Sequence, residues 1–371
     1  MGDRIHALDG MRAVAACLVV VHHLGVATFG AALSSGGYIA LGHIVSGLTA
    51  SGVELFFVLS PVVLAGPYIR DKRVLDTGKY GARRVERLFP PYLAAWLLAG
   101  LQIYLLTAFP TWWTERASLP SFSLSDWISQ IGIIYIGNHS YNFAWWSLTI
   151  EVAFYVMLPV IVPLVRYANR SKNGVFIALL GSIAVSCVVY ALPSAGNVPI
   201  LSRMAIYASC FWAGLFIAAK GPLEGALSFV AMAAGVAWVL AAGAFDELNP
   251  HVGWGLLWFG VVSAAMESRS WISRRLSNFR IVWLGERSYS LYLLHFTVIG
   301  LACHAVSLMT DSKGAVFILL TRTISIVASL AIAIVVFHFI ERRFARNLVT
   351  ADMILPWGRH ADAAQTCLTA A

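Results

Sequence analysis

The sequence predicts an all-α integral membrane protein of about ten transmembrane helices, with both termini in the cytoplasm. Three observations predict this class: the composition, the spacing of the apolar runs and the placement of the basic residues. Of the 371 residues, 59% are hydrophobic and 12% are charged, and the mean hydropathy is +0.76. Soluble domains carry about 25% charged residues, so a soluble protein of this composition could not cover its surface.

Apolar runs recur along the whole chain and are separated by short polar or basic segments. Most of them reach the roughly 20 residues that an α-helix needs to cross the hydrocarbon core. The run at 252–266 is shorter, and Trp127–Ile136 is too short to span, which indicates an interfacial or re-entrant segment. The ten predicted spans are 8–29, 44–69, 88–109, 144–165, 175–192, 202–219, 226–243, 252–266, 288–309 and 316–340.

Basic residues fall almost entirely on one set of alternate connecting segments. With ten spans, 22 of the 26 lysines and arginines lie on the side of the two termini. The other four are Arg116, Arg203, Lys313 and Arg322. Cytoplasmic loops of membrane proteins are enriched in Lys and Arg, so this bias places both termini in the cytoplasm and the loop 110–143 outside. The net charge of +8 therefore reflects topology, and no nucleic-acid partner is expected.

The chain is expected to form one membrane domain over residues 1–345, inserted in the plasma (inner) membrane. A cytoplasmic, poorly ordered tail is expected over residues 346–371. The first apolar run contains Arg12, His22 and His23, which predicts a retained helix rather than a signal peptide. The five cysteines form no C-x-x-C pair, and no metal site is predicted.

Several ionisable residues lie inside the predicted spans, where burial is costly and each one is a candidate for function. Arg12 and His23 share one helix face at ~100° per residue, with His23 ~16.5 Å further along, whereas His22 points ~100° away. His22 is therefore interpreted as a packing or hydrogen-bonding residue. For any single buried group, the alternative is a helix–helix hydrogen bond that only stabilises the bundle.

Two carboxylates, Glu54 and Glu151, are predicted at the same depth as His23. Each of the three lies about 22 Å above the cytoplasmic end of its span. A shared layer would allow a general base and its orienting partners to meet. Closer to the cytoplasm, the ninth span contributes Tyr292 and His295.

Three arginines, Arg83, Arg84 and Arg87, open the third predicted span on its cytoplasmic side. One interpretation is a topology signal that also contacts lipid head groups. The same spacing would allow the guanidinium groups to bind a phosphorylated ligand.

Five segments, in order along the chain, match the motifs of one known family. LDGMRAVA at 8–15, followed by His23, is similar to its opening LDGLRAxA…H pattern. The segments 52–60, 83–92, 146–155 and 288–295 are similar to its GVxLFFVLSG, RRxxRIxPxY, WSLxxExxFY and SYSLYLxH patterns. The chain thus resembles the acyltransferase-3 family of membrane O-acyltransferases over nearly its whole length. Ala144 is a departure, since members often have a histidine at that position.

The resemblance implies transfer of an acyl group, most often acetyl, from cytoplasmic acyl-CoA to a hydroxyl. The implied acceptor is a cell-surface polysaccharide or its lipid-linked precursor. The implied partners are acetyl-CoA or another acyl-CoA, the glycan acceptor and the bilayer, with no tightly bound cofactor.

The resemblance also implies roles for the residues found above. His23 would be the general base. The other implied catalytic residues are Arg12, which would contact the donor, and Glu54 and Glu151, which would orient or charge the site. The residues implied to hold the CoA phosphates are Arg83, Arg84 and Arg87. The residues implied to bind substrate are Tyr292, His295 and Trp146.

Two alternatives stay open at this level. The acceptor could be a small molecule, such as a macrolide or an amino sugar, and the acyl group could be succinyl. The protein could instead be a secondary transporter or flippase that uses its His and Glu residues as a proton relay. The sequence shows no paired interrupted spans of the kind that inverted repeats produce, and a transporter would leave the cytoplasmic arginines without a use.

Overall fold

A computed structural model of the chain describes residues 5–26, 39–70, 73–117, 120–133, 141–192, 200–311 and 314–345. All regular structure within these residues is helical, as predicted. Seven helices are long and apolar enough to cross a membrane, and the bent pair α9–α10 would make eight. The predicted tail at 346–371 lies outside the described residues.

The long helices coincide with predicted spans. They are α1 (His6–Val21), α4 (Gly52–Arg70), α5 (Thr77–Ala108), α7 (Trp146–Ala168), α8 (Gly174–Ala191), α15 (Ser288–Met309) and α16 (Ala315–Val336). Short turns extend three of them. These turns are η1 (His22–Val26) after α1, η2 (Phe143–Trp145) before α7, and η3 (Phe337–Glu341) with α17 (Arg342–Ala345) after α16.

The remaining predicted spans correspond to shorter helices. The span at 202–219 is divided between α9 (Ile200–Ile206) and α10 (Ala208–Lys220), which are bent by 62° relative to one another. The next two are α11 (Ala226–Ala242) and α12 (Pro250–Met266), each of 17 residues. The count of ten spans therefore stays a prediction. The other short helices are α3 (Ile39–Ala50), α6 (Leu124–Ser129), α13 (Trp271–Leu276) and α14 (Phe279–Glu286).

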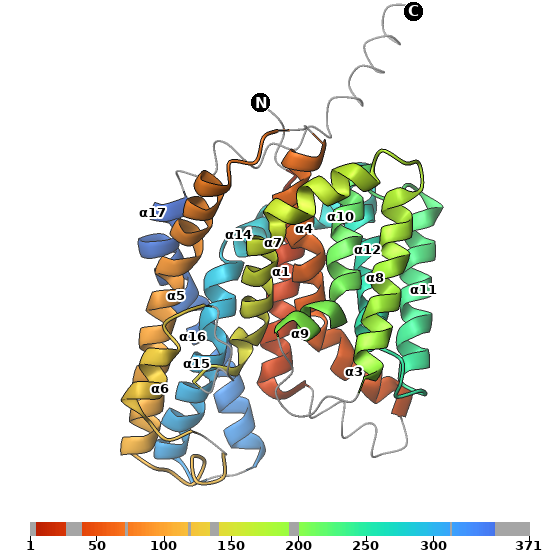
Figure 1. Cartoon of the computed structure of the whole chain (residues 1–371). Helices are drawn as coiled ribbons and strands as arrows, with labels where there is room; N and C mark the ends of the chain where they lie inside the picture. The colour runs from red at the N-terminus through yellow and green to blue at the C-terminus, as the bar shows by residue number, and fades with distance from the viewer. Residues whose placement is uncertain are drawn as a thin grey trace, which may run out of the picture.

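The helices run up and down through one bundle (Figure 1). The first helix starts, and the last helix ends, at the upper end of Figure 1, where α4 also ends and α5 begins. Basic residues mark this same end, since Arg70 closes α4, Arg166 lies in the last turn of α7 and Lys220 closes α10. This arrangement agrees with the predicted charge asymmetry, and the assignment of that end to the cytoplasm stays a prediction.

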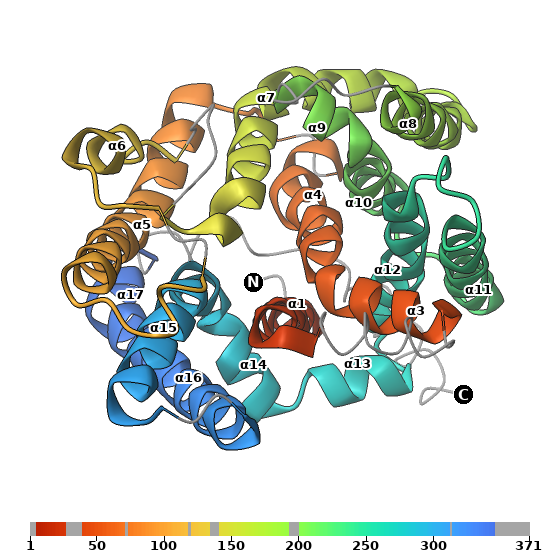
Figure 2. The ribbon, with the colours of Figure 1, turned by 90° about the horizontal axis from the view of Figure 1, so that it is seen from below.

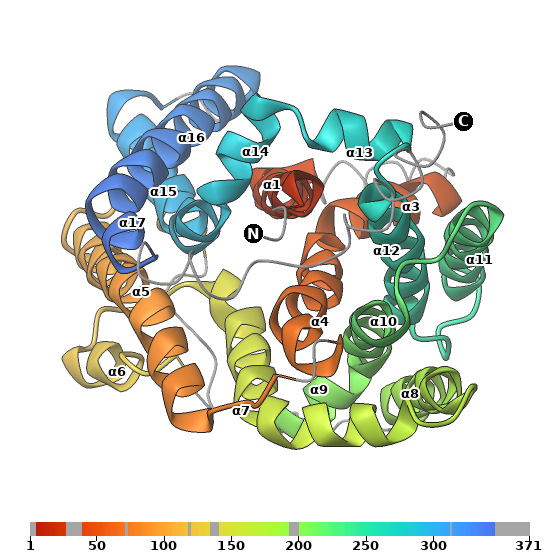
Figure 3. The ribbon, with the colours of Figure 1, turned by 90° about the horizontal axis from the view of Figure 1, so that it is seen from above.

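Helix α1 lies at the centre of the bundle (Figures 2 and 3), packed against α4, α12, α13, α14 and α15. Two glycines permit this close packing. Gly10 lies against the backbone carbonyl of Leu276, and Gly285 lies against that of Asp9, so a Cβ at either position would collide with it. Small residues let helix backbones approach closely inside membranes. The packing therefore sets the position and the rotation of α1.

Helix α5 begins earlier than the span predicted at 88–109. The Asp76 side chain accepts a hydrogen bond from the Lys79 backbone N–H at 3.0 Å, which caps the helix and lowers the pKa of the Asp76 carboxyl. No proline follows until Pro90, and the helix starts at Thr77, directly after this cap. Arg83, Arg84 and Arg87 consequently lie about two to three turns inside α5 rather than at its first turn.

Candidate active site

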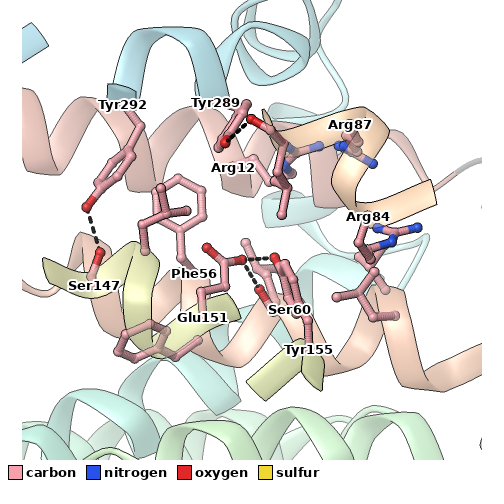
Figure 4. Close-up of a pocket in the computed structure, with 16 residues that line it drawn as sticks. Arg12, Phe56, Ser60, Arg84, Arg87, Ser147, Glu151, Tyr155, Tyr289 and Tyr292 are labelled. Carbon is pink, nitrogen blue, oxygen red and sulfur yellow. Dashed lines mark hydrogen bonds between the residues drawn. The ribbon is translucent and has the colours of Figure 1, made fainter. Parts of the chain in front are cut away.

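A cavity opens between α1, α4, α5, α7 and α15 and encloses about 840 Å³, its open mouth included (Figure 4). Three arginines, Arg12, Arg84 and Arg87, gather toward one side of it. The opposite side is formed by Ser147 and Tyr292. The cavity therefore has a cationic side and a side lined by hydroxyl groups.

Glu151 lies between these two sides on α7. Its Oε1 accepts hydrogen bonds from the Ser60 hydroxyl, at 2.6 Å, and from the Tyr155 hydroxyl. Two hydroxyl donors stabilise an ionised carboxylate. Against the three arginines, one glutamate leaves the described cavity wall with a surplus of positive charge.

A second carboxylate, outside the cavity wall, interacts with two of the arginines. Glu341, in η3, is 3% exposed, accepts a hydrogen bond from the Ser290 hydroxyl at 2.5 Å, and interacts electrostatically with Arg87 and Arg12. Sequence reasoning missed this residue because it ends an apolar run beside Arg342 and resembled a boundary residue. The signal was present, since Glu341 is the one carboxylate between positions 315 and 345.

The predicted base, His23, contacts a second histidine. Its Nδ1 lies 2.9 Å from the Val19 carbonyl oxygen and 3.1 Å from Nε2 of His295. Nδ1 of His295, which is fully buried, lies 2.7 Å from the Tyr292 carbonyl oxygen. A carbonyl only accepts, so we assign the proton of each ring to Nδ1. His295 Nε2 then accepts from His23, and Nε2 of His23 keeps a free lone pair.

The neighbouring histidine faces a different partner. Nδ1 of His22 lies 3.2 Å from the hydroxyl of Thr49, and its ring is perpendicular to that of His23. The two histidines thus contact different residues, Thr49 and His295, and their different functional roles stay a prediction. The π-helical turn that holds both histidines contains Gly25, whose φ of 93° an L residue rarely adopts.

Tyr292 stands between the cavity and the histidine pair. Its hydroxyl bonds to the Ser147 hydroxyl, at 2.6 Å, and donates to the Ala144 carbonyl. Its ring centroid lies 5.8 Å from that of His295. Arg12 and Tyr292 line the cavity. His23 lies outside it, on the far side of Tyr292, where it contacts His295.

The predicted layer of His23, Glu54 and Glu151 is not formed. Glu54 lies 2.5 Å from Nδ1 of His251 on α12, and Glu151 faces the arginine cavity. The depth of a residue along its helix axis does not define the rotation of the helix about that axis. Residues at equal depth can therefore face different neighbours. His251 was not predicted as a site residue, since it sits at the start of the short 252–266 run.

Two further predicted residues lie outside the cavity wall. The ring of Trp146 packs against that of Tyr207, with centroids 5.7 Å apart, and Tyr207 packs on His251 at 4.3 Å. Trp146 thus belongs with Glu54 and His251 rather than with the arginines. Arg83 is not among the cavity-lining residues, because Arg84 and Arg87, three residues apart, occupy the face of α5 that turns inward.

The described residues contain no group of three or more His, Cys, Asp or Glu side chains arranged to hold a metal ion. What they do hold is an arginine-rich cavity and a nearby histidine with a free ring nitrogen. This combination suits transfer of a group from an anionic donor to a hydroxyl.

Comparison with known families agrees with this chemistry. Residues 5–339 match the acyltransferase domain of the acyltransferase-3 (Acyl_transf_3) family. The chain belongs to this family.

Similar proteins are known in several bacteria. A Staphylococcus aureus protein named "Putative O-acetyltransferase" is 23% identical over 94% of this chain and 58% of its own length. The acyltransferase MdmB of Streptomyces mycarofaciens is 28% identical over 80% of this chain and 79% of its own. "Putative peptidoglycan O-acetyltransferase YrhL" of Bacillus subtilis is 26% identical over 80% of this chain and 49% of its own. The chain thus spans little more than half of the staphylococcal relative, and no solved structure matches it.

Proposed function

We propose that the protein is a multi-pass O-acyltransferase of the plasma (inner) membrane. It moves an acyl group, most simply acetyl, from cytoplasmic acyl-CoA to a hydroxyl of a cell-surface polysaccharide or its lipid-linked precursor. The observation that carries the proposal is the cavity with three arginines on one side and, beyond Tyr292 on the other, the His23–His295 pair. The glycan acceptor is supported by the name of one relative, which refers to peptidoglycan.

The arginine side of the cavity suits the phosphates of CoA. Arg12, Arg84 and Arg87 supply guanidinium groups, which bind phosphate oxygens through paired, charge-assisted hydrogen bonds. Glu341 and Glu151 compensate part of the arginine charge within the protein before the donor arrives. The cavity mouth then attracts an anionic donor and holds its nucleotide end there.

The distance from the arginines to the base suits a long donor arm. Arg12 and His23 are separated by eleven residues, or about 16.5 Å along the helix axis. An arm such as pantetheine could carry the thioester across this distance. Tyr292 would have to turn its ring aside to connect the cavity with His23.

The chemistry follows from the free lone pair on Nε2 of His23. This nitrogen takes the proton of the acceptor hydroxyl while the hydroxyl oxygen attacks the thioester carbonyl. The new C–O bond forms and the C–S bond breaks. The CoA sulfur leaves as thiolate and receives the proton from the His23 imidazolium. His295 holds the His23 ring in the required tautomer by accepting its Nδ1–H, and it acts as a positioning residue.

The experiment uses membranes that contain the full chain, radiolabelled acetyl-CoA and isolated cell-wall glycan. We expect label in the glycan and an equal release of free CoA, and we expect neither with His23→Ala. Transport of a solute or lipid across the membrane without any use of acetyl-CoA would contradict the proposal and favour the transporter alternative.

A further inference from the structure

A second opening lies beside the cavity, between α5 and α7. Its wall is almost entirely apolar and includes Leu88, Phe89, Ile133 and Val152, and it encloses about 700 Å³, the open side included. The two helices diverge here, because α5 packs on α15 and η3 while α7 packs on α4. Figure 3 shows α5 and α7 on the periphery of the bundle. The opening is therefore a groove in the side of the molecule.

The groove faces the surroundings of the bundle, beside the predicted span 144–165 on α7 and at the start of the predicted span 88–109 on α5. Val85 on α5 and Val156 on α7, which line it, are 62% and 65% exposed. Along α5 the lining extends from Thr77 to Phe89, or about 18 Å at 1.5 Å per residue. This length is comparable to one leaflet of a hydrocarbon core of about 30 Å. An apolar groove that is open to the hydrocarbon core has the length and the chemistry to accept the acyl chain of a lipid.

One cation lies in the wall of the groove. Arg84 lines both the groove and the arginine cavity. Its guanidinium carbon lies 5.6 Å from the centre of the Tyr80 ring, and its buried Nε donates no hydrogen bond in the structure. A buried N–H without an acceptor is costly, and a phosphate oxygen would satisfy it. Thr77, about two turns before Arg84 on α5, also lines the groove.

We propose that this groove is a binding site for an anionic phospholipid of the surrounding bilayer. One acyl chain lies along Leu88, Phe89 and Val152, and the phosphate pairs with Arg84. The described wall offers a cation and a few hydroxyl groups, which suffice for a phosphate but provide little to recognise a sugar. This favours a phospholipid over a glycan-carrying lipid as the occupant.

The site has a consequence for catalysis that rests on the proposed function. Arg84 is shared by the groove and the cavity, so the lipid phosphate and the CoA phosphates compete for one guanidinium group. Anionic lipid should therefore raise the apparent KM for the acyl donor and leave kcat nearly unchanged.

Gly81 offers a precise way to fill the groove. It lines the groove, and a Cβ at this position meets no atom within 4 Å. Leucine also favours a helix more than glycine does, so Gly81→Leu should fold normally. The matched control is Gly181→Leu on α8, where a Cβ likewise meets no atom within 4 Å and the residue is exposed.

The experiment measures lipid that stays with the full-length protein after extraction from nanodiscs of phosphatidylcholine with a minor fraction of phosphatidylglycerol. Native mass spectrometry counts each lipid, with no donor or acceptor present. We expect the wild type and Gly181→Leu to retain phosphatidylglycerol in preference to phosphatidylcholine. Gly81→Leu should retain about tenfold less, since the leucine occupies the part of the groove beside Arg84, where the phosphate would lie, and the loss is on the order of one charged hydrogen bond.

Two results would overturn the proposal. One is equal retention of phosphatidylglycerol by Gly81→Leu and the wild type, and the other is a wild type without preference for the anionic lipid. Arg84→Gln should abolish the preference but keep some lipid. If protein from its native membrane loses a sugar-carrying lipid rather than a phospholipid on Gly81→Leu, the assigned occupant is wrong. Because lipid retention is measured without acyl-CoA, it can hold or fail independently of the acyltransferase reaction.

Discussion

Nε2 of His295 lies 3.1 Å from Nδ1 of His23, although 272 residues separate them in the chain. The sequence resemblance suggested a substrate-binding role for His295, whereas the geometry favours a positioning role behind the base. A buried neutral imidazole that accepts a hydrogen bond holds its partner in one tautomer and leaves that partner's second nitrogen free.

The first prediction separates the two neighbouring histidines of η1, the turn that follows α1. His23→Ala should lower acyl transfer by roughly 10²–10⁴-fold, the usual cost of losing a general base. His22→Ala should keep most of the activity, because His22 contacts Thr49 rather than His295. The measurement is label incorporation at matched membrane abundance. An inactive His22→Ala beside an active His23→Ala would reverse the assignment.

The second prediction tests the positioning role of His295. His295→Leu removes the acceptor of the His23 Nδ1–H, and the rate should fall by roughly ten- to hundredfold. His295→Gln retains an acceptor and should recover part of this loss. The pH profile of kcat should change in His295→Leu, since the protonation of His23 is no longer linked to its partner. Equal losses in the two variants, with unchanged pH profiles, would indicate a purely structural role.

A third prediction uses three arginines of one helix. Arg84→Gln and Arg87→Gln should each raise the apparent KM for acyl-CoA by roughly ten- to hundredfold, as expected for a lost charged hydrogen bond. The KM for the acceptor should change little. Arg83→Gln is the matched control, because Arg83 is on the same helix but not on the cavity wall. Direct titration of CoA checks the result, and a control that is as defective as the two variants would show that the cluster acts through topology alone.

The fourth prediction concerns orientation. Reporter fusions after Lys79 and after Arg280 should report a cytoplasmic location, and a fusion near Ser121 should report an external one. The reason is the excess of basic residues on one side of the bundle. A cytoplasmic signal at Ser121 would show that the predicted orientation in the membrane is reversed. The arginine cavity would then open on the side without acyl-CoA.

The sequence by itself determined the class of the protein and much of the cavity wall. Composition and apolar runs predicted a helical bundle, and the structure has helices at the predicted spans. Arg12, Arg84, Arg87, Glu151 and Tyr292 were all predicted as site residues and all line the cavity. Arg12 and Glu151 were found because a charge in an apolar run is costly and is therefore a candidate for function. The functional roles of all five residues stay predictions.

Only the tertiary structure decided which of these residues meet. Glu54 pairs with His251, 197 residues away in the chain. Glu341, in η3, interacts electrostatically with Arg87 and Arg12. Helical periodicity gives the direction of a side chain relative to its own axis. It does not give the rotation of that helix or the identity of its neighbour. Here the close contacts of Gly10 and Gly285 set the position of α1, and through it the meeting of His23 with His295 rather than with a carboxylate.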